Sequence, residues 1–317
     1  MRAVQITEFG GPDVLEVRDV DEPVPGEGEV LITVERAGVN YADTHQVENS
    51  YLSKAELPLI PGGEVVGHTP DGRRVVALVG SGGYAEKAVA RAAYTWDVPE
   101  GVSDGEALAL VLQGTTAWHL LKTSTHLKPG ESVLVHAGAG GVGSLAVQLA
   151  KLWGAGRVIA TASTEDKRKQ VLDLGADAAI DGDPEGLKDR VLEANVGKPV
   201  DIVLEMVGGR TFDESFDALG RFGRLVTFGA ASRQSATPID PGRLMKGSKT
   251  IAGFWLADCF HNPALLGDPL KELFALAVDG KLRPIVGGDY ALSDIATAHE
   301  DMRARRTVGK LLLDPTR

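Results

Sequence analysis

A glycine-rich segment between an apolar run and a helical pattern constrains the fold of this 317-residue chain more than any other feature. The run Val133–Val135 has the β-branched character of a buried parallel strand, and the apolar residues of 142–153 recur with a helical period. Gly138, Gly140 and Gly143 lie between the two segments as G-x-G-x-x-G. In a chain with 39 glycines the pattern carries weight only in this context, where it predicts a dinucleotide-binding turn.

The three glycines have separate expected roles in such a turn. We expect Gly138 to allow a tight turn, and Gly140 to let a pyrophosphate approach the backbone because it has no Cβ. Gly143 is expected to bring the helix close to the strand. The free N–H groups and the positive dipole end of that helix would then face the phosphates.

Strand and helix patterns alternate through the middle of the chain. Further strands are expected at 158–162, 178–180, 201–206, 225–228 and 251–254. The helix after the second strand opens with Ser163 or Thr164 as its N-cap and ends at Gly175. With right-handed crossovers, this alternation predicts an α/β fold with a parallel, doubly wound sheet.

The first 115 residues have a different pattern, in which short strand candidates are separated by Gly and Pro turns. They predict a mostly antiparallel β-barrel, followed by a helical pattern from Gly105 to Leu121 that is broken at Gly114. In the tail, a helix is expected to open with Ser293 as its N-cap.

The final strand Gly309–Leu313 has no partner nearby in sequence, so we expect it to return to the barrel. The expected domains are therefore 1–117, completed by 260–317, and 118–259.

The composition narrows the class of function. The net charge of −11 disfavours a nucleic-acid or anionic-membrane partner. Cys259 is the only cysteine, so no internal disulfide can form. Because the sequence has no apolar run of membrane-spanning length, and its first residues lack a signal-peptide core, a cytoplasmic location is expected.

The residues after the second predicted strand indicate which dinucleotide is preferred. NAD-binding folds usually have Asp or Glu there for the ribose 2′-hydroxyl. This chain has Ala162, Ser163 and Thr164, with Lys167 and Arg168 one turn later. Hydroxyls and cations suit a 2′-phosphate, which favours NADPH, although the two cations could also be a solvated helix face.

Seven motifs, taken in order, resemble one family. They are Ala37–Asp43, Pro61–Gly67, Gly82–Glu86, Leu112–Ala117, Ala137–Gly143, Val207–Gly209 and Gly309–Leu311. In this order the chain resembles the zinc-free quinone oxidoreductase, or ζ-crystallin, group of the medium-chain dehydrogenase/reductase superfamily. The resemblance covers nearly the whole chain and implies a GroES-like β-barrel catalytic domain together with a Rossmann domain that binds NADP.

The resemblance also implies site residues. It places Asn40 and Asp43 in the active-site loop, where we expect catalytic roles for them and for Tyr41. Beside the substrate we expect Tyr41, His45, Tyr51 and Trp255. The aromatic face of Trp255 suits a flat acceptor, although this residue could also belong to the core or to a dimer edge. The implied cofactor-binding residues are Asn40, Thr116, Ala139, Gly140, Gly141, Val142, Gly143, Ser163, Lys167, Val207, Phe228, Gly229, Ala230, Phe254, Gly309 and Lys310.

The zinc-dependent relatives need metal ligands that this sequence does not have at the corresponding positions. Asn40 stands where they have a cysteine, and Gly62–Glu64 stands where they have Gly-His-Glu. No metal is therefore expected, and alcohol oxidation is disfavoured. Two further departures concern the zinc-free group itself: His45 replaces a frequent tyrosine, and Asp181 and Gly182 replace a frequent Asn-Tyr pair.

Without a metal, the protein's task is to hold the nicotinamide against an acceptor that is already electrophilic. We expect an NADPH-dependent reductase of quinones or other small electron acceptors. Two alternatives remain open, an enoyl or alkenal double-bond reductase and a protein that holds NADPH without turnover. Tyr41 or His45 is the candidate proton donor, and Tyr41 could equally be a packing residue. A homodimer is expected from the resemblance and the apolar sixth strand.

Overall fold

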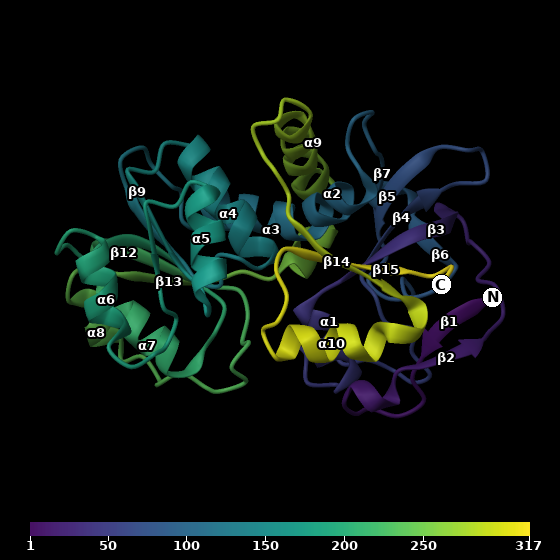
Figure 1. Ribbon diagram of the computed structural model, residues 1–317, viewed down its shortest axis with the longest axis horizontal. Helices are drawn as coiled ribbons and strands as arrows, with labels where there is room; N and C mark the ends of the chain where they lie inside the picture. Colours follow the sequence, from purple (N-terminus) through teal and green to yellow (C-terminus); the bar gives the residue numbers. More distant parts are fainter. The chain divides into compact units, whose positions relative to one another are not determined.

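The computed structural model describes residues 1–317, which divide into two compact units. Met1–Thr115 and Cys259–Arg317 form one unit, which we call the terminal unit because it contains both chain ends (Figure 1). Thr116–Asp258 forms the other, called the central unit. None of the helices has the length and hydrophobicity that a membrane span requires.

The central unit is built on a six-stranded parallel sheet with the strand order β10-β9-β8-β11-β12-β13. The strands are β8 (Ser132–Val135), β9 (Arg157–Thr161), β10 (Ala178–Ile180), β11 (Val200–Glu205), β12 (Leu219–Thr227) and β13 (Thr250–Gly253). The direction in which strands are added reverses between β8 and β11. Binding crevices of doubly wound sheets form at the carboxyl ends of strands at such a reversal. The predicted parallel, doubly wound sheet is confirmed.

Helices connect these strands. They are α4 (Gly141–Leu152), α5 (Glu165–Asp173), α6 (Leu187–Ala194), α7 (Gly209–Ala218) and α8 (Pro241–Met245), and α3 (Thr115–His119) precedes β8. Of the two predicted N-caps of α5, Thr164 is the one used, since its hydroxyl accepts the Lys167 N–H at 3.3 Å. Leu134, Val203 and Phe216 are fully or almost fully buried in the core of this unit.

The terminal unit contains a seven-stranded sheet with the path β14-β15-β3-β4-β5-β7, and β6 also pairs with β3. The strands are β3 (Glu29–Val39), β4 (Glu64–His68), β5 (Arg74–Leu78), β6 (Lys87–Arg91), β7 (Thr95–Asp97), β14 (Val286–Ala291) and β15 (Lys310–Asp314); β1 (Arg2–Gln5) and β2 (Glu16–Asp19) form a separate pair. Every pairing except β14–β15 is antiparallel. The last strand returns as expected, with Leu312 of β15 opposite Gly38 of β3.

The helices of the terminal unit differ from expectation in two places. The helices of this unit are α1 (Tyr41–Val47), α2 (Asp104–Leu108), α9 (Ala264–Val278) and α10 (Ile295–Arg303). The predicted break at Gly114 is wrong, because helical turns of π type over Ala109–Gly114 carry the chain from α2 into α3. A Cβ on Gly114 would lie 3.1 Å from Leu273, so this glycine allows close packing of α9. The N-cap of α10 is Asp294 and not Ser293, which lies in a preceding 3₁₀ turn.

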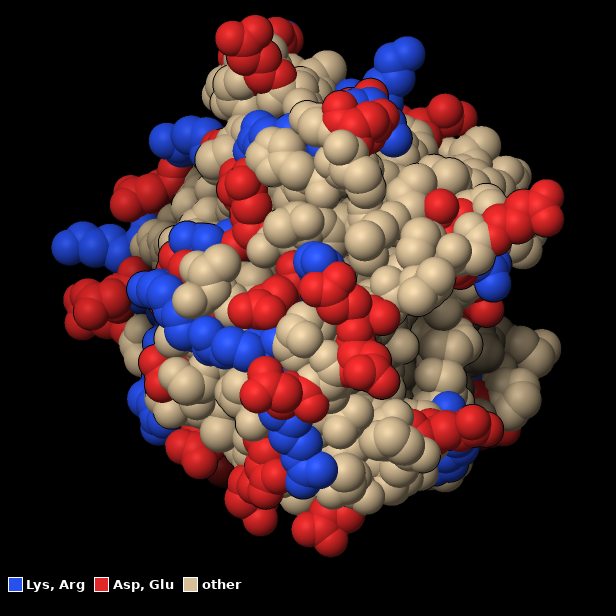
Figure 2. Space-filling view, turned by 90° about the vertical axis from the view of Figure 1, so that its right-hand side faces the viewer, with Lys and Arg blue, Asp and Glu red and all other residues tan.

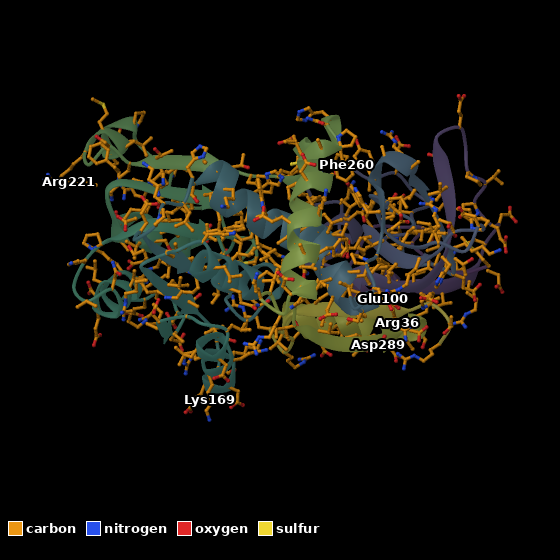
Figure 3. All side chains as sticks on the ribbon, turned by 90° about the horizontal axis from the view of Figure 1, so that it is seen from above. Arg36, Glu100, Lys169, Arg221, Phe260 and Asp289 are labelled. Atoms are coloured by element: carbon orange, nitrogen blue, oxygen red, sulfur yellow. The ribbon has the colours of Figure 1, made fainter.

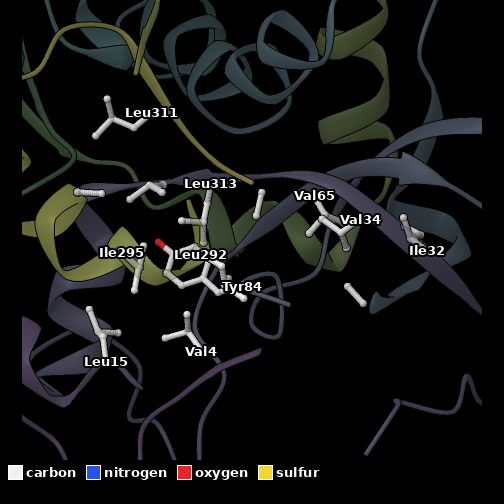
Figure 4. Packing of buried hydrophobic residues seen from close by; sticks show 14 of the residues in the cluster. Val4, Leu15, Ile32, Val34, Val65, Tyr84, Leu292, Ile295, Leu311 and Leu313 are labelled. Atoms are coloured by element: carbon white, nitrogen blue, oxygen red, sulfur yellow. The ribbon is translucent and has the colours of Figure 1, made fainter. Parts of the chain in front are cut away.

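The core of the terminal unit joins segments from both ends of the chain. Figure 4 shows Val4 and Tyr84 packed with Leu292, Ile295 and Leu313 from the tail. All five side chains are at most 1% exposed. Burial of this apolar surface holds the C-terminal segment in place as part of the unit.

Ion pairs connect neighbouring strands at the surface of the terminal unit. On the face shown in Figure 2, acidic and basic side chains are interspersed. Arg36 of β3 and Asp289 of β14, labelled in Figure 3, are paired at 3.3 Å (Nε to Oδ2). Arg36 also lies 3.2 Å from Asp314 of β15. These pairs connect three strands of one sheet, although exposed pairs of this kind contribute little free energy.

Candidate active site

The turn between β8 and α4 is tight, as predicted, but for a different reason. The Gly140 N–H donates to the Ala137 carbonyl, and the Gly138 N–H donates to the Thr161 carbonyl, both at 2.8 Å. The left-handed residue of the turn is Ala137, with φ +50°, and not Gly138. Gly138 is needed because a Cβ there would lie 2.7 Å from the Cβ of Ala160 in β9.

The start of α4 offers unpaired backbone donors. A Cβ on Gly143 would lie 2.2 Å from the Ala137 carbonyl oxygen, so this glycine lets the helix approach the turn as closely as it does. Gly140 is the N-cap and no side chain caps the helix. The N–H groups of the first helical residues have no carbonyl partner within the helix, and Gly140–Val142 are partly exposed. The combination of free donors and a positive dipole end suits a phosphate.

The end of β9 presents the residues expected at a 2′-phosphate. Ser163 is exposed and Lys167 is partly exposed on the first turn of α5. Arg168 is already engaged, since its guanidinium donates to the Ala162 carbonyl at 3.1 Å and pairs with Asp181 at 3.4 Å. This corner therefore contains an acid as well as two cations.

Glu205 organises the loop after β11. Its Oε1 accepts the N–H groups of Val207 at 2.7 Å and Gly208 at 2.9 Å. The residue is fully buried, and this burial raises the pKa of its carboxyl. The loop after β12 is fixed to the same place, because the Phe228 N–H donates to the Glu205 carbonyl at 3.0 Å and a Cβ on Gly229 would lie 3.1 Å from the Met206 carbonyl oxygen. The structure thus brings Val207, Phe228 and Gly229 together, with Ala230 next along the same loop.

Aromatic residues follow β13. The Phe254 N–H continues the ladder by donating to the Thr227 carbonyl at 2.9 Å. The Phe254 ring is stacked on His119 of α3, with ring centroids 5.4 Å apart and planes 23° apart. Thr116 lies on the same helix and is almost fully buried, whereas Trp255 is partly exposed.

A buried polar cluster occupies the interior of the terminal unit. The ammonium of Lys310 donates to Glu64 Oε1 and, at 3.0 Å, to Asn40 Oδ1. The Asn40 amide donates to both oxygens of Glu64, at 2.7 and 2.8 Å, and its Oδ1 also accepts from Gln113 Nε2 at 3.2 Å. The donors and acceptors of the Asn40 side chain are thus all used inside the protein.

Two predicted cofactor residues from the tail have structural roles in this unit. Lys310 and its partner Glu64 are both completely buried. Gly309 has φ +54°, and a Cβ there would lie 2.1 Å from the Ile285 carbonyl oxygen. Direct contact of Asn40, Gly309 or Lys310 with a cofactor stays a prediction, because their observed contacts are within the terminal unit.

Asp43 links this cluster to a second set of buried groups. Its Oδ2 accepts the Asn40 N–H at 2.8 Å and the Tyr84 hydroxyl at 2.7 Å, and that hydroxyl lies 3.4 Å from His299 Nε2. Burial and the negative charge of Glu64 raise the pKa of Asp43 to about 7. Burial raises the pKa of Tyr84, and burial with the nearby Arg303 lowers the pKa of His299 to about 4.

The residues expected beside the substrate in the first loop do meet. The His45 ring contacts the Tyr41 ring edge-on with centroids 5.6 Å apart, and it is stacked on Tyr51 at 6.2 Å. His45 Nδ1 lies 2.9 Å from the Ser50 hydroxyl. Tyr41, His45 and Tyr51 therefore form one aromatic group on and beside α1.

Comparison with known proteins places the chain in a family. The sequence profile "Alcohol dehydrogenase GroES-like domain" matches residues 26–100, and "Zinc-binding dehydrogenase" matches residues 141–266. The chain is 34% identical to a quinone oxidoreductase of Pseudomonas aeruginosa over 99% of each protein. It is 32% identical to human quinone oxidoreductase over 99% of this chain and 97% of the human protein. The chain belongs to the quinone oxidoreductase family.

Solved members of the quinone oxidoreductase family have the same fold. A mycobacterial protein in complex with NADPH is 40% identical, with a TM-score of 0.93, covering 99% of this chain and 100% of the other. Escherichia coli quinone oxidoreductase, also in complex with NADPH, is 32% identical with a TM-score of 0.92 over the same shares. The predicted family resemblance and fold class are confirmed.

In this chain, Asn40 and Glu64 occupy the positions at which zinc-dependent relatives are expected to bind metal. Both side chains are instead tied to Lys310. No group of three or more His, Cys, Asp or Glu side chains is arranged to hold a metal ion.

Four buried polar residues were not predicted as site residues from the sequence. One organises the loop after β11 and three belong to the buried polar groups of the terminal unit, namely Glu205, Gln113, Tyr84 and His299. Glu205 was detectable as an acid at the end of an apolar strand. Gln113 similarly ends the apolar run Ala107–Leu112. Tyr84 and His299 carry no such local signal, since they meet across 215 residues of sequence.

Proposed function

We propose that this protein binds NADPH and catalyses the transfer of its hydride to a quinone or a related activated carbonyl or alkene acceptor, without zinc. The observation that carries the proposal is the uncapped start of α4 behind a tight glycine-rich turn. Such a helix start binds phosphate groups through its N–H donors. Full-length relatives with this fold that were solved with NADPH support the same assignment.

The end of β9 supports a preference for the phosphorylated dinucleotide. Ser163 and Lys167 would hold the 2′-phosphate, and no acid directly follows the strand to bind a ribose 2′-hydroxyl. Ala139–Gly143 would cradle the pyrophosphate. Val207, Phe228, Gly229 and Ala230, positioned around Glu205, would line the rest of the dinucleotide crevice.

When bound, the nicotinamide would supply a hydride from C4 to the acceptor. The aromatic group of Tyr41, His45 and Tyr51 offers flat faces to a planar acceptor. Reduction of a quinone or enone also requires a proton, which Tyr41 or His45 would donate. The Asp43 carboxyl would hold a proton near neutral pH on the oxygen that does not accept from Asn40 and Tyr84, because its pKa is raised to about 7.

The experiment is to follow NADPH oxidation by absorbance with one panel of small quinones and one of enones and enoyl thioesters. We expect turnover with quinones and a lower Kd for NADPH than for NADH. Turnover with enones alone would favour the double-bond reductase alternative, and tight NADPH binding without turnover would favour a non-catalytic protein. A preference for NADH, or failure to bind either dinucleotide, would overturn the proposal.

We also propose that the protein is a cytoplasmic homodimer. Strand β13 is at the edge of the six-stranded sheet, so its outer backbone groups are available for pairing with a second copy. The single cysteine agrees with a reducing compartment. Light scattering is expected to give twice the chain mass, and a monomer at micromolar concentration would contradict the dimer.

A further inference from the structure

A buried histidine stands behind the dinucleotide turn, and the proposed chemistry does not use it. His136 follows β8 directly and is 1% exposed. Its Nδ1 lies 3.2 Å from the Thr161 hydroxyl, and its Nε2 lies 2.7 Å from the Ser215 hydroxyl. Thr161 ends β9 and Ser215 belongs to α7, so the imidazole joins three elements of the central unit.

The directions of these hydrogen bonds are fixed by counting hydrogens. Ser215 donates its hydroxyl hydrogen to the Thr211 carbonyl at 2.6 Å, so its oxygen must accept from His136 Nε2–H. In a neutral imidazole Nδ1 is then an acceptor, and it takes the hydroxyl hydrogen of Thr161. The Thr161 oxygen in turn accepts the Ala137 N–H at 3.1 Å. One continuous relay thus runs from Ala137 through Thr161, His136 and Ser215 to Thr211.

The relay begins at Ala137, whose backbone conformation needs support. Ala137 is in the left-handed conformation, with φ +50°, which is unfavourable for an L-residue. Thr161 holds the turn at two adjacent residues, by its hydroxyl on the Ala137 N–H and by its carbonyl on the Gly138 N–H. The Ala137 carbonyl then accepts from Gly140, and its oxygen faces the space that a Cβ on Gly143 would fill. Any rotation of Ala137 would move the start of α4.

We propose that Thr161 and His136 are positioning residues for the dinucleotide, because the neutral relay holds the turn in the shape that presents the N–H groups of α4. The inference rests on the proposed function. Neither side chain has to touch the ligand, since each acts on the turn through the Ala137 backbone. Burial lowers the pKa of His136 to about 4, so the imidazole is neutral under ordinary conditions and its tautomer is set by Ser215.

The first test compares Thr161→Val with Thr161→Ser in the full-length protein. The valine removes the hydroxyl with little change in shape, and we expect the Kd for NADPH to rise about tenfold while kcat at saturating NADPH changes less than about twofold. The serine retains the hydroxyl and is expected to restore most of the affinity. Thr125→Val is the matched control, because Thr125 is equally buried and donates to the Leu120 carbonyl at 2.8 Å, in a network that does not include the turn. It should lower the melting temperature without changing the Kd.

The second test removes one imidazole hydrogen bond at a time. It tests the positioning role even if Thr161→Val does not fold. In His136→Asn the amide oxygen replaces Nδ1 and still accepts from Thr161, whereas in His136→Gln the amide nitrogen replaces Nε2 and retains only the Ser215 bond. We expect His136→Gln to weaken NADPH binding about fivefold more than His136→Asn. Equal Kd values for these two variants, or an unchanged Kd in a folded Thr161→Val, would overturn the inference. If the wild-type protein fails to bind NADPH, the proposed function itself fails, which is a different result.

Discussion

Each unit contains a buried polar network, and one of these networks includes an ion pair whereas the other does not. In the terminal unit, a complete ion pair between Lys310 and Glu64 is buried with the amide of Asn40. In the central unit, the relay through His136 contains only neutral groups. The first arrangement depends on charge balance, whereas the second depends on the direction of each hydrogen bond.

This difference separates stability from ligand affinity. Removal of one partner from a buried ion pair leaves a bare charge, which is far more costly than the loss of one neutral hydrogen bond. We call the buried polar groups around Lys310, Glu64 and Asn40 the terminal cluster. Substitutions in this cluster should therefore act mainly on the free energy of unfolding. Substitutions around the dinucleotide turn should act mainly on NADPH binding, with smaller effects on stability.

The largest effect is expected from Lys310→Met. The variant leaves the Glu64 carboxylate buried without its cation, and we expect a loss of about 3–5 kcal/mol in the free energy of unfolding, measured by urea denaturation. Adding Glu64→Gln should recover much of this loss, because the neutral amide retains an acceptor for Asn40. A double variant no more stable than Lys310→Met would show that the ion pair is not what balances the cluster.

Gly143→Ala tests the other side of the comparison. The new Cβ would lie 2.2 Å from the Ala137 carbonyl oxygen, so the turn or the helix must shift. We expect a cost of about 1–3 kcal/mol in stability together with a clear loss of NADPH affinity in a fluorescence titration. Gly220→Ala is the control, because a Cβ there would come no closer than 3.4 Å to its neighbours, which is ordinary van der Waals contact. A Gly143→Ala protein that is less stable but binds NADPH normally would break the proposed division between the two units.

The dinucleotide turn and the terminal cluster also differ in how much of each could be predicted from the sequence. The dinucleotide turn lies within one short segment, so its strand, glycines and helix could all be recognised together. The polar cluster is assembled from positions 40, 64, 113 and 310, and no local pattern shows that these side chains meet. The family resemblance implied that Asn40 and Lys310 contact the cofactor, which stays a prediction, but it did not indicate that they bind each other, Glu64 and Gln113.

Physical detail within the turn was also hidden. Nothing in the sequence indicates that Ala137, an ordinary helix former, adopts the left-handed conformation while Gly138 does not. In the structure, the Thr161 hydroxyl and carbonyl accept the N–H groups of these two residues, a contact across 24 residues that no local pattern indicates. Likewise, the break predicted at Gly114 followed the usual behaviour of glycine in a helix, but contact with Leu273 overrides that preference.

Asp43 makes the terminal cluster sensitive to pH. Its pKa is raised in the folded protein from 3.8 to about 7, so between these values the folded state binds a proton that the unfolded state does not. Its contribution to stability is therefore fully present below about pH 4 and is lost as the pH rises through about 7. In Asp43→Asn this dependence should be absent, and the slope of unfolding free energy between pH 5 and 7 should change by up to about 1.4 kcal/mol per pH unit. Identical slopes for the variant and the wild type would show that Asp43 is ionised when folded.

The smallest expected effect is at the exposed corner of the dinucleotide crevice, where Asp181 pairs with Arg168 at 3.4 Å. Asp181→Asn removes a negative charge beside the proposed 2′-phosphate and releases the guanidinium. We expect the Kd for NADPH to fall about threefold with no change for NADH, and the gain to shrink as salt increases. Asp279→Asn is the matched control, since Asp279 forms an exposed ion pair with Lys281 in the terminal unit. Equal gains for both dinucleotides would mean that this corner does not contact the 2′-phosphate, and the preference for NADPH would then have to come from Ser163 and Lys167 without help from Arg168.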